Sequence, residues 1–242
     1  MMNLVSRLHR GIASSAFVVL LGVTGTGCVG IEGSGVVQSQ ERSVLEFHAI
    51  DASGSMELEV VQGSPQRVEV STDDNLLPLL RTEVHGGKLT IEMKSFVDPT
   101  GAIRVRITAP VIDAVSLSGS SDAQIKRFTG RDFRLETSGS GNVTLDAMKL
   151  TGTLTIDTSG SSEIRAQGES RALTIDTSGS SNIDTRSLAA ASVAIDSSGS
   201  SDILVFAKES LTVDLSGSAS VGYLGDPRVG ASVSGSGEIQ RL

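Results

Sequence analysis

The stretch Asp176-Thr177-Ser178-Gly179-Ser180-Ser181-Asn182-Ile183 is one copy of a phrase that returns throughout the second half of the chain. The first glycine of each Ser-Gly-Ser marks a copy, and successive copies are separated by 20, 21, 19, 20, 18 and 18 residues. These corner glycines are Gly119, Gly139, Gly160, Gly179, Gly199, Gly217 and Gly235. Self-similarity at this period is typical of stacked structural repeats.

Apolar residues recur at fixed distances from each corner glycine. Four residues before it stand Val115, Leu135, Ile156, Ile175, Ile195, Val213 and Ala231. Four residues after it stand Ala123, Val143, Ile164, Ile183, Ile203, Val221 and Ile239. The position six residues before it is also apolar in every copy except the first, which has Asp113. Apolar positions two residues apart are typical of strands with one buried face, so each repeat is predicted to form a strand, a Ser-Gly-Ser corner, a strand and a second, looser corner.

One such unit cannot bury its apolar side alone, whereas stacked units share an inner column of Ile, Val and Leu side chains. We therefore predict an all-β fold, a parallel β-helix or β-solenoid with rungs of about 20 residues. Glycine at the corner permits backbone angles that a side chain forbids, and the small serines beside it let the corners stack closely.

The repeat is less regular toward the N-terminus. The phrase appears once around Gly54, and the rhythm then breaks until the copy at Gly119. Alternating segments from Arg67 to Ser71, from Lys88 to Lys94 and from Ile103 to Ala109 predict an irregular β portion that covers the first rung. The last copy runs almost to Leu242, so its open strand edge needs shielding by charge (Arg241), by shortness or by another chain.

The first 27 residues carry Arg7 and Arg10 and then an apolar run from about Ile12 to Val23. This run is too short for a membrane span and is typical of a secretory signal. Cys28, the only cysteine, follows directly and resembles the lipidated cysteine of bacterial lipoproteins; the alternative is an ordinary signal peptide that leaves one free thiol. We predict a lipoprotein-type signal peptide over residues 1–27, a flexible tether over 28–41 and the solenoid domain over 42–242.

The formal net charge is −8, and loss of the two signal-peptide arginines makes the exported chain still more acidic. This charge disfavours binding to nucleic acid and electrostatic attraction to anionic membrane surfaces. Because Cys28 is the only cysteine, no disulfide is expected within the domain.

The repeats and the N-terminal strands together resemble a known family, the head GIN domain of autotransporter adhesins. The resemblance covers about residues 42–242. Its carrying segments are Ser138-Gly139-Ser140-Gly141-Asn142-Val143, the phrase at Gly179, Phe47-His48-Ala49-Ile50 through Val60-Val61-Gln62-Gly63, Val68-Glu69-Val70, Asp74-Asn75-Leu76 and Lys88-Leu89-Thr90-Ile91. The resemblance implies a right-handed β-helix-like fold in secreted or lipid-anchored bacterial proteins. Coiled-coil heptads are absent from the sequence, so we do not expect a self-exporting adhesin.

Two columns of acidic residues flank the corners. In a stacked coil, carboxylates one rung apart repel each other, and calcium between rungs would relieve the repulsion. The candidate metal ligands are Asp157, Asp176, Asp196, Asp214, Glu163 and Asp202. The simpler interpretation, which we adopt, is that these side chains bond to nearby backbone N–H groups and face solvent. No other cofactor is expected.

Catalytic residue types are scarce after the signal peptide, where only His48 and His85 remain. His48 occupies a position that is apolar in other copies and is predicted to pack in the core, and Phe96 is predicted to be a core or end-cap residue. Rows of aspartate that recur at every rung are expected to be structural rather than a catalytic pair, so we do not predict an enzyme.

These features together predict an exported, non-enzymatic lipoprotein of the bacterial cell envelope, in the outer membrane and facing the periplasm or the surface. We expect a binding or display role toward an envelope protein or a surface polysaccharide, and possible pairing of copies through the open C-terminal rung. The alternatives are a calcium-stabilised repeat module and, less favoured, a polysaccharide-active β-helix enzyme.

Overall fold

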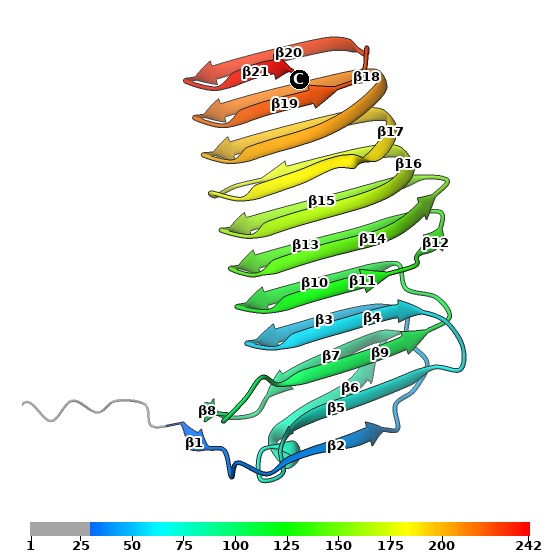
Figure 1. Cartoon of the computed structure of the whole chain (residues 1–242), viewed down its shortest axis with the longest axis vertical. Helices are drawn as coiled ribbons and strands as arrows, with labels where there is room; N and C mark the ends of the chain where they lie inside the picture. Colours follow the sequence, from blue (N-terminus) through cyan, green and yellow to red (C-terminus); the bar gives the residue numbers. More distant parts are fainter. Residues whose placement is uncertain (1–29) are drawn as a thin grey trace, which may run out of the picture.

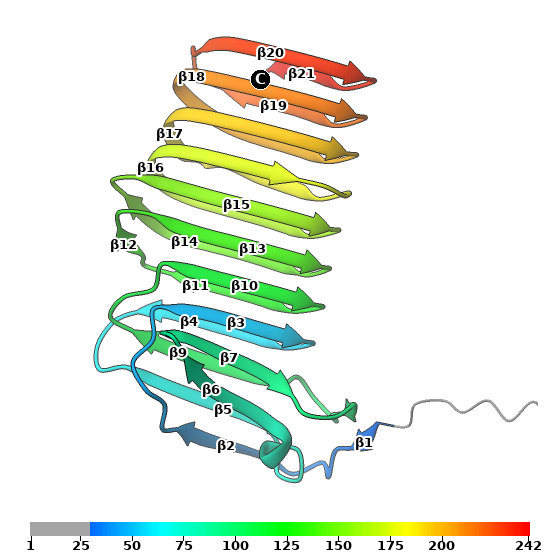
Figure 2. The ribbon, with the colours of Figure 1, turned by 180° about the vertical axis from the view of Figure 1, so that it is seen from behind.

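The computed structural model describes residues 30–242, so the predicted signal peptide and Cys28 lie outside the described residues. The chain forms a β-solenoid, which confirms the predicted fold class (Figures 1 and 2). Its strands are β1 (Ile31–Glu32), β2 (Val37–Arg42), β3 (Ala49–Gly54), β4 (Glu57–Gln62), β5 (Arg67–Asp73), β6 (Leu80–His85), β7 (Lys88–Met93), β8 (Val97–Asp98), β9 (Arg104–Ala109), β10 (Ala114–Gly119), β11 (Asp122–Lys126), β12 (Thr129–Gly130), β13 (Phe133–Gly139), β14 (Asn142–Leu150), β15 (Thr153–Gly160), β16 (Glu163–Thr177), β17 (Asn182–Gly199), β18 (Asp202–Gly217), β19 (Ser220–Leu224), β20 (Arg228–Gly235) and β21 (Glu238–Arg241). The short 3-10 helix η1 covers Leu77–Leu79.

Two parallel faces run the length of the solenoid, and the Ser-Gly-Ser corners join them along one edge. Face A contains the strand that leads into each corner, and face B contains the strand that leaves it. Face A is built from β7, β3, β10, β13, β15, the later parts of β16, β17 and β18, and β20. Face B is built from β9, β4, β11, β14, the earlier parts of β16, β17 and β18, and β19 and β21. In β16 to β18 the strand continues through the second corner, with register shifts there in place of a separate loop.

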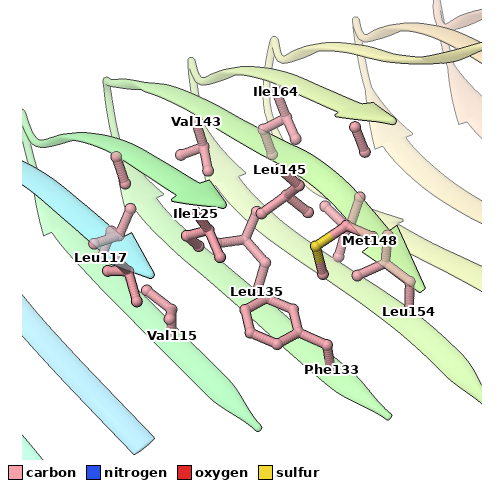
Figure 3. Close-up of a cluster of buried hydrophobic side chains, with 14 of the residues drawn as sticks. Val115, Leu117, Ile125, Phe133, Leu135, Val143, Leu145, Met148, Leu154 and Ile164 are labelled. Atoms are coloured by element: carbon pink, nitrogen blue, oxygen red, sulfur yellow. The ribbon is translucent and has the colours of Figure 1, made fainter. Parts of the chain in front are cut away.

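The rungs stack in register at the corner glycines. Gly119 pairs with Gly139, Gly139 with Gly160, and Gly199 with Gly217, which in turn pairs with Gly235. This register aligns the predicted apolar columns and buries them between the faces, as Figure 3 shows for the residues around Leu135 and Leu145. Ile156 and Ile175, which are adjacent in one column, are both completely buried. The periodicity therefore predicted both the strand direction and the core.

The corner glycines are required by close stacking as well as by backbone angles. Gly119 and Gly139 have φ of 88° and 139°, but Gly179 and Gly199 do not adopt left-handed backbone angles. At Gly179 an added Cβ would nevertheless lie 2.2 Å from the carbonyl oxygen of Gly160 in the rung before. A side chain is thus excluded by the neighbouring backbone even where φ would permit one.

Antiparallel strands close the N-terminal end of the solenoid, which we call the base. The rung of β7 and β9 lies under that of β3 and β4, although it comes later in the chain. β6 pairs antiparallel with β7, and β5 pairs antiparallel with both β9 and β2. This arrangement covers the first rung, as predicted for the irregular N-terminal portion.

The predicted flexible tether over residues 28–41 is wrong for residues 30–41. They form β1, which pairs with β8, and most of β2, which pairs with β5. The buried Asp73 fixes the segment between them, since its carboxylate accepts hydrogen bonds from Gly35 N–H at 2.8 Å and Thr100 N–H at 2.9 Å. These bonds and the Thr100 hydroxyl, which has the largest effect, lower the pKa of Asp73. Glycine and serine in this segment permit tight turns around a buried acid.

Candidate binding surface

The structure aligns five carboxylates of face A in one outward-facing row, which we call the acidic ladder. Each ladder residue is three positions before a corner glycine. Because strand residues alternate between the two sides of a sheet, its side chain points away from the core while its neighbours face the core. Register pairing follows the row from rung to rung. The ladder consists of Glu136, Asp157, Asp176, Asp196 and Asp214. Serines end it at both sides, Ser116 below and Ser232 above.

A groove of about 480 Å³ follows the acidic ladder along face A as far as Asp196. Serines one position before the corner glycines form one side of it, namely Ser138, Ser159, Ser178 and Ser198. Neighbouring carboxylates are about 4.8 Å apart, the spacing of paired strands. At that distance two charges repel by about 1 kcal/mol in water and by about 3.5 kcal/mol at an effective dielectric constant of 20. The groove therefore favours a partner that supplies positive charge or hydrogen-bond donors.

Within residues 30–242, only the lower end of the ladder is neutralised by a cationic side chain. Arg134 donates a hydrogen bond to Glu136 at 2.6 Å, and its Nη2 forms an ion pair with Asp157 Oδ2 at 2.8 Å that lacks hydrogen-bond alignment. Hydrogen bonds from Arg134 and Ser116 lower the pKa of Glu136. Burial raises the pKa of Asp157; Arg134 opposes this effect and the adjacent Asp176 adds to it.

The upper ladder is open to an external partner. Among residues 30–242, no ion pair involves the last three ladder residues, Asp176, Asp196 and Asp214. Because no Lys or Arg side chain of the described residues pairs with them, their carboxylates are accessible to a cationic group of a binding partner on face A. This end of the ladder is therefore the part of face A best able to recognise a charged group.

The second acidic column lies on face B and is interrupted by neutral residues. It runs Asp122, Asn142, Glu163, Asn182, Asp202, Ser220 and Glu238. Asn142 bridges to the rung below, because its backbone N–H and its Nδ2 donate to Asp122 Oδ1 at 2.7 and 2.9 Å. The alternation keeps carboxylates about two rungs apart, so repulsion in this column is weaker than in the acidic ladder.

A patch of both charges lies lower on face B, beside a groove of about 530 Å³. Arg104 pairs with Glu57 at 2.9 Å, and Lys126 pairs with Glu59 at 2.9 Å. Hydrogen bonds and charge from Lys126 and Arg106 lower the pKa of Glu59. The sequence signal for this patch was the alternation of arginine with apolar residues in Arg104-Val105-Arg106-Ile107, which we interpreted only as a strand.

The candidate metal ligands fall on two faces. Asp157, Asp176, Asp196 and Asp214 belong to the acidic ladder on face A, while Glu163 and Asp202 lie on face B with Asn182 between them. Within the described part of the chain, no three His, Cys, Asp or Glu side chains are grouped in a way that could hold a metal ion.

Two aromatic residues near the base differ from their predictions. His48 is exposed and pairs with Asp113 at 3.0 Å, because Phe47 is buried in its place. His48 and Asp113 each stand six residues before a corner glycine, a position that is apolar in the other copies. The two exceptions to the apolar pattern therefore lie side by side in adjacent rungs. Phe96 is not a core residue either, since 77% of it is exposed beside β1.

A buried row of hydroxyl groups lies inside the corners and was not predicted from the sequence. Positions two residues before and after the corner glycine face inward and carry Thr or Ser in the middle rungs. Thr158 Oγ1 lies 2.8 Å from Ser181 Oγ, and Thr177 Oγ1 lies 3.0 Å from Ser201 Oγ, so hydrogen bonds link successive rungs. These serines are structural and are not available as nucleophiles on the surface.

Comparisons with known proteins agree with this architecture. The family model described as "Putative auto-transporter adhesin, head GIN domain" matches residues 46–227, and the chain belongs to this family. A crystal structure titled as a putative adhesin from Bacteroides fragilis is similar with 25% identity and a TM-score of 0.83, covering 88% of this chain and 100% of that one. A structure titled as a putative lipid binding protein from Parabacteroides distasonis has 23% identity and a TM-score of 0.68, with coverage of 88% and 100%, and shares the fold. No curated protein matches the chain.

Proposed function

We propose that this chain is an exported, non-enzymatic lipoprotein of the bacterial cell envelope, anchored in the outer membrane through Cys28 and facing the periplasm or the surface. The family and the similar structures are named for adhesion and lipid binding rather than for an enzyme activity, which supports a binding role. No helix within residues 30–242 is long and apolar enough to cross a bilayer. The N-terminal lipid is therefore the proposed means of attachment.

The position of the first described residues supports anchoring at the base. The described part of the chain begins at Gly30, two residues after Cys28. Ile31 donates its N–H to the carbonyl oxygen of Phe96 at 2.9 Å, and both side chains are exposed. An acyl anchor at Cys28 would hold these apolar side chains near the bilayer, where their insertion adds to the binding free energy.

The acidic ladder carries the proposal of an adhesin-like role. Asp176, Asp196 and Asp214 are exposed and free of internal ion pairs within residues 30–242, and the first two share a groove with serine hydroxyl groups. Such a row suits a partner that presents amines, guanidinium groups or hydroxyl groups, as envelope proteins and surface polysaccharides do. Charge complementarity of this kind gives specificity and salt-dependent association.

Capture of envelope components on the immobilised chain tests this role. We expect that Asp176→Asn combined with Asp196→Asn reduces capture of a bound component and its sensitivity to salt, because both carboxylates are removed without loss of volume. Arg104→Gln combined with Arg106→Gln on face B is the matched control and should leave capture unchanged. Equal capture by the wild type and the double Asn variant would contradict the role of face A.

Fractionation of cells tests the anchor separately. The wild type should sediment with outer membranes, whereas Cys28→Ser should appear in a soluble fraction after export. Membrane association of the Cys28→Ser variant at the wild-type level would refute lipid anchoring without bearing on the acidic ladder.

A further inference from the structure

The rung formed by β20 and β21, which we call the terminal rung, leaves the apolar core open at one end of the solenoid (Figure 1). Val229, Ala231 and Val233 occupy inward columns, yet all of β20 is exposed. Their partners in the rung below are the completely or almost completely buried Leu211, Val213 and Leu215. Within residues 30–242, no strand pairs with the outer edge of this rung.

The outer edge also presents backbone hydrogen-bonding groups. Ser236, Glu238 and Leu242 donate their N–H groups to the rung below, at 2.8, 3.1 and 2.9 Å. In a parallel ladder alternate residues bond to opposite neighbours, so the N–H and C=O groups of the residues between them point outward. The same alternation on β20 leaves those of Val229, Ala231 and Val233 directed at the open edge.

Strand edges are usually protected by charge, proline or shortness. The base follows this rule, since its edge strands β2 and β6 carry Glu41, Arg42, Arg81 and Glu83. In contrast, β20 has one charged residue, Arg228, followed by Val-Gly-Ala-Ser-Val-Ser-Gly. In the same rung, β21 is short and carries Glu238 and Arg241, as the base edges do. It is therefore the longer, nearly uncharged β20 that leaves the terminal rung open to another strand.

We propose that the terminal rung pairs with the terminal rung of a second copy of this chain, through antiparallel strands related by a two-fold axis. Ala231 and Ile239 each lie four residues from the corner Gly235, on opposite faces, so one axis can pass through both. About this axis Ala231 opposes Ala231 of the second copy, and Ile239 opposes its own counterpart. Both faces are thus in register at once, and inward residues meet inward residues.

This register matches the side chains and the backbone groups. Val229 opposes Val233 of the second copy, so the exposed apolar side chains of β20 in the two copies form one continuous row at the dimer interface. All of these residues have outward-directed N–H and C=O groups, and the pairs are therefore of the hydrogen-bonded antiparallel type. On the outer surface, Arg228 opposes Ser234 and Glu238 opposes Gln240, so like charges do not meet.

The acidic ladder is compatible with the same contact. It stops at Asp214, and Ser232 takes its place in the terminal rung. The acidic ladders of the two copies are therefore separated by the two terminal rungs, one from each copy, and do not meet at the dimer interface. Because the base is protected by charge, the contact closes as a two-fold dimer and does not continue into a filament.

Cysteine substitution tests the register. In a Cys28→Ser background of the full chain, Ala231→Cys places two thiols opposite each other on the axis, within the Cα separation that a disulfide needs. We expect a disulfide-linked dimer under mild oxidation from Ala231→Cys and only background from Ser216→Cys, an exposed position one rung below. Equal yields at the two positions would overturn the proposal.

Mass measurement gives a second test that does not depend on oxidation. Light scattering of the Cys28→Ser chain should give twice the mass of one chain. Ala231→Lys, which brings two charges together on the axis, should halve that mass, while Ser232→Lys, which faces Gly230 of the second copy, should not. Circular dichroism of each variant confirms that it is folded. A monomeric Cys28→Ser chain would refute the dimer.

Discussion

Replacement of Gly179 by alanine measures how tightly the corners are stacked. The added Cβ would lie 2.2 Å from the carbonyl oxygen of Gly160. The two atoms must move apart by about 0.8 Å to reach a separation of 3.0 Å, which is still a very short contact. The same carbonyl accepts the Ser180 N–H at 2.8 Å, so an equal displacement lengthens this hydrogen bond to about 3.6 Å and breaks it. Gly179, like Gly199, is an informative corner, because its φ lies outside the left-handed region and steric exclusion acts alone.

Overpacking together with the lost hydrogen bond should lower the free energy of unfolding by about 3 kcal/mol. For a domain of this size the melting temperature should fall by about 6–12 °C, measured by circular dichroism. Gly101→Ala is the control, since an added Cβ there meets no atom within 4 Å. Indistinguishable melting curves for the two variants would show that the corners yield easily, and the steric account of the glycines would be wrong.

The remaining predictions concern the core and the acidic ladder. Ile175→Asp should cost more than about 4 kcal/mol in urea unfolding, since it buries an unpaired charge, whereas Ile175→Val should cost about 1 kcal/mol; a well-folded Asp variant would refute the stacked core. Asp157→Asn should stabilise the protein most at neutral pH. Burial raises the pKa of Asp157 above its ordinary value of 3.8, so the wild type regains stability as the pH falls and the carboxylate takes up a proton. The difference in unfolding free energy between variant and wild type should therefore shrink at acid pH; a difference that does not change with pH contradicts this. Calcium should leave the melting temperature unchanged; an increase that EDTA reverses would support the alternative of a calcium-stabilised module.

The regular rungs could be predicted because every copy repeats the same information. The spacing of the corner glycines fixed the register, and alternation about Gly139 or Gly160 fixed which residues face the core. The base had no such redundancy. β5 pairs antiparallel with β9, β6 pairs antiparallel with β7, and the segment around Gly35 is fixed by the distant Asp73. Local composition does not encode these contacts.

The candidate surface was predictable in outline only. The positions of the acidic ladder follow from the repeat, but the capture of its lower end by Arg134 depends on side-chain geometry across two rungs. The inward hydroxyl row was open to prediction, since Thr158 and Thr177 have the same parity as the apolar columns. We interpreted the neighbouring serines by their size alone and so missed their hydrogen bonds.

The distribution of exposed apolar side chains links the two proposed contacts. Between Ala114 and Leu224 no large hydrophobic residue is exposed, so the flanks of the middle rungs are entirely suited to water. The exposed ones lie in the base and around its first rung, including Ile31 and Phe96, or at the terminal rung, including Val229 and Val233. Exposed apolar area is costly unless it meets another surface. A lipid surface at one end and a second copy at the other would cover both groups and leave the acidic ladder on the flank accessible.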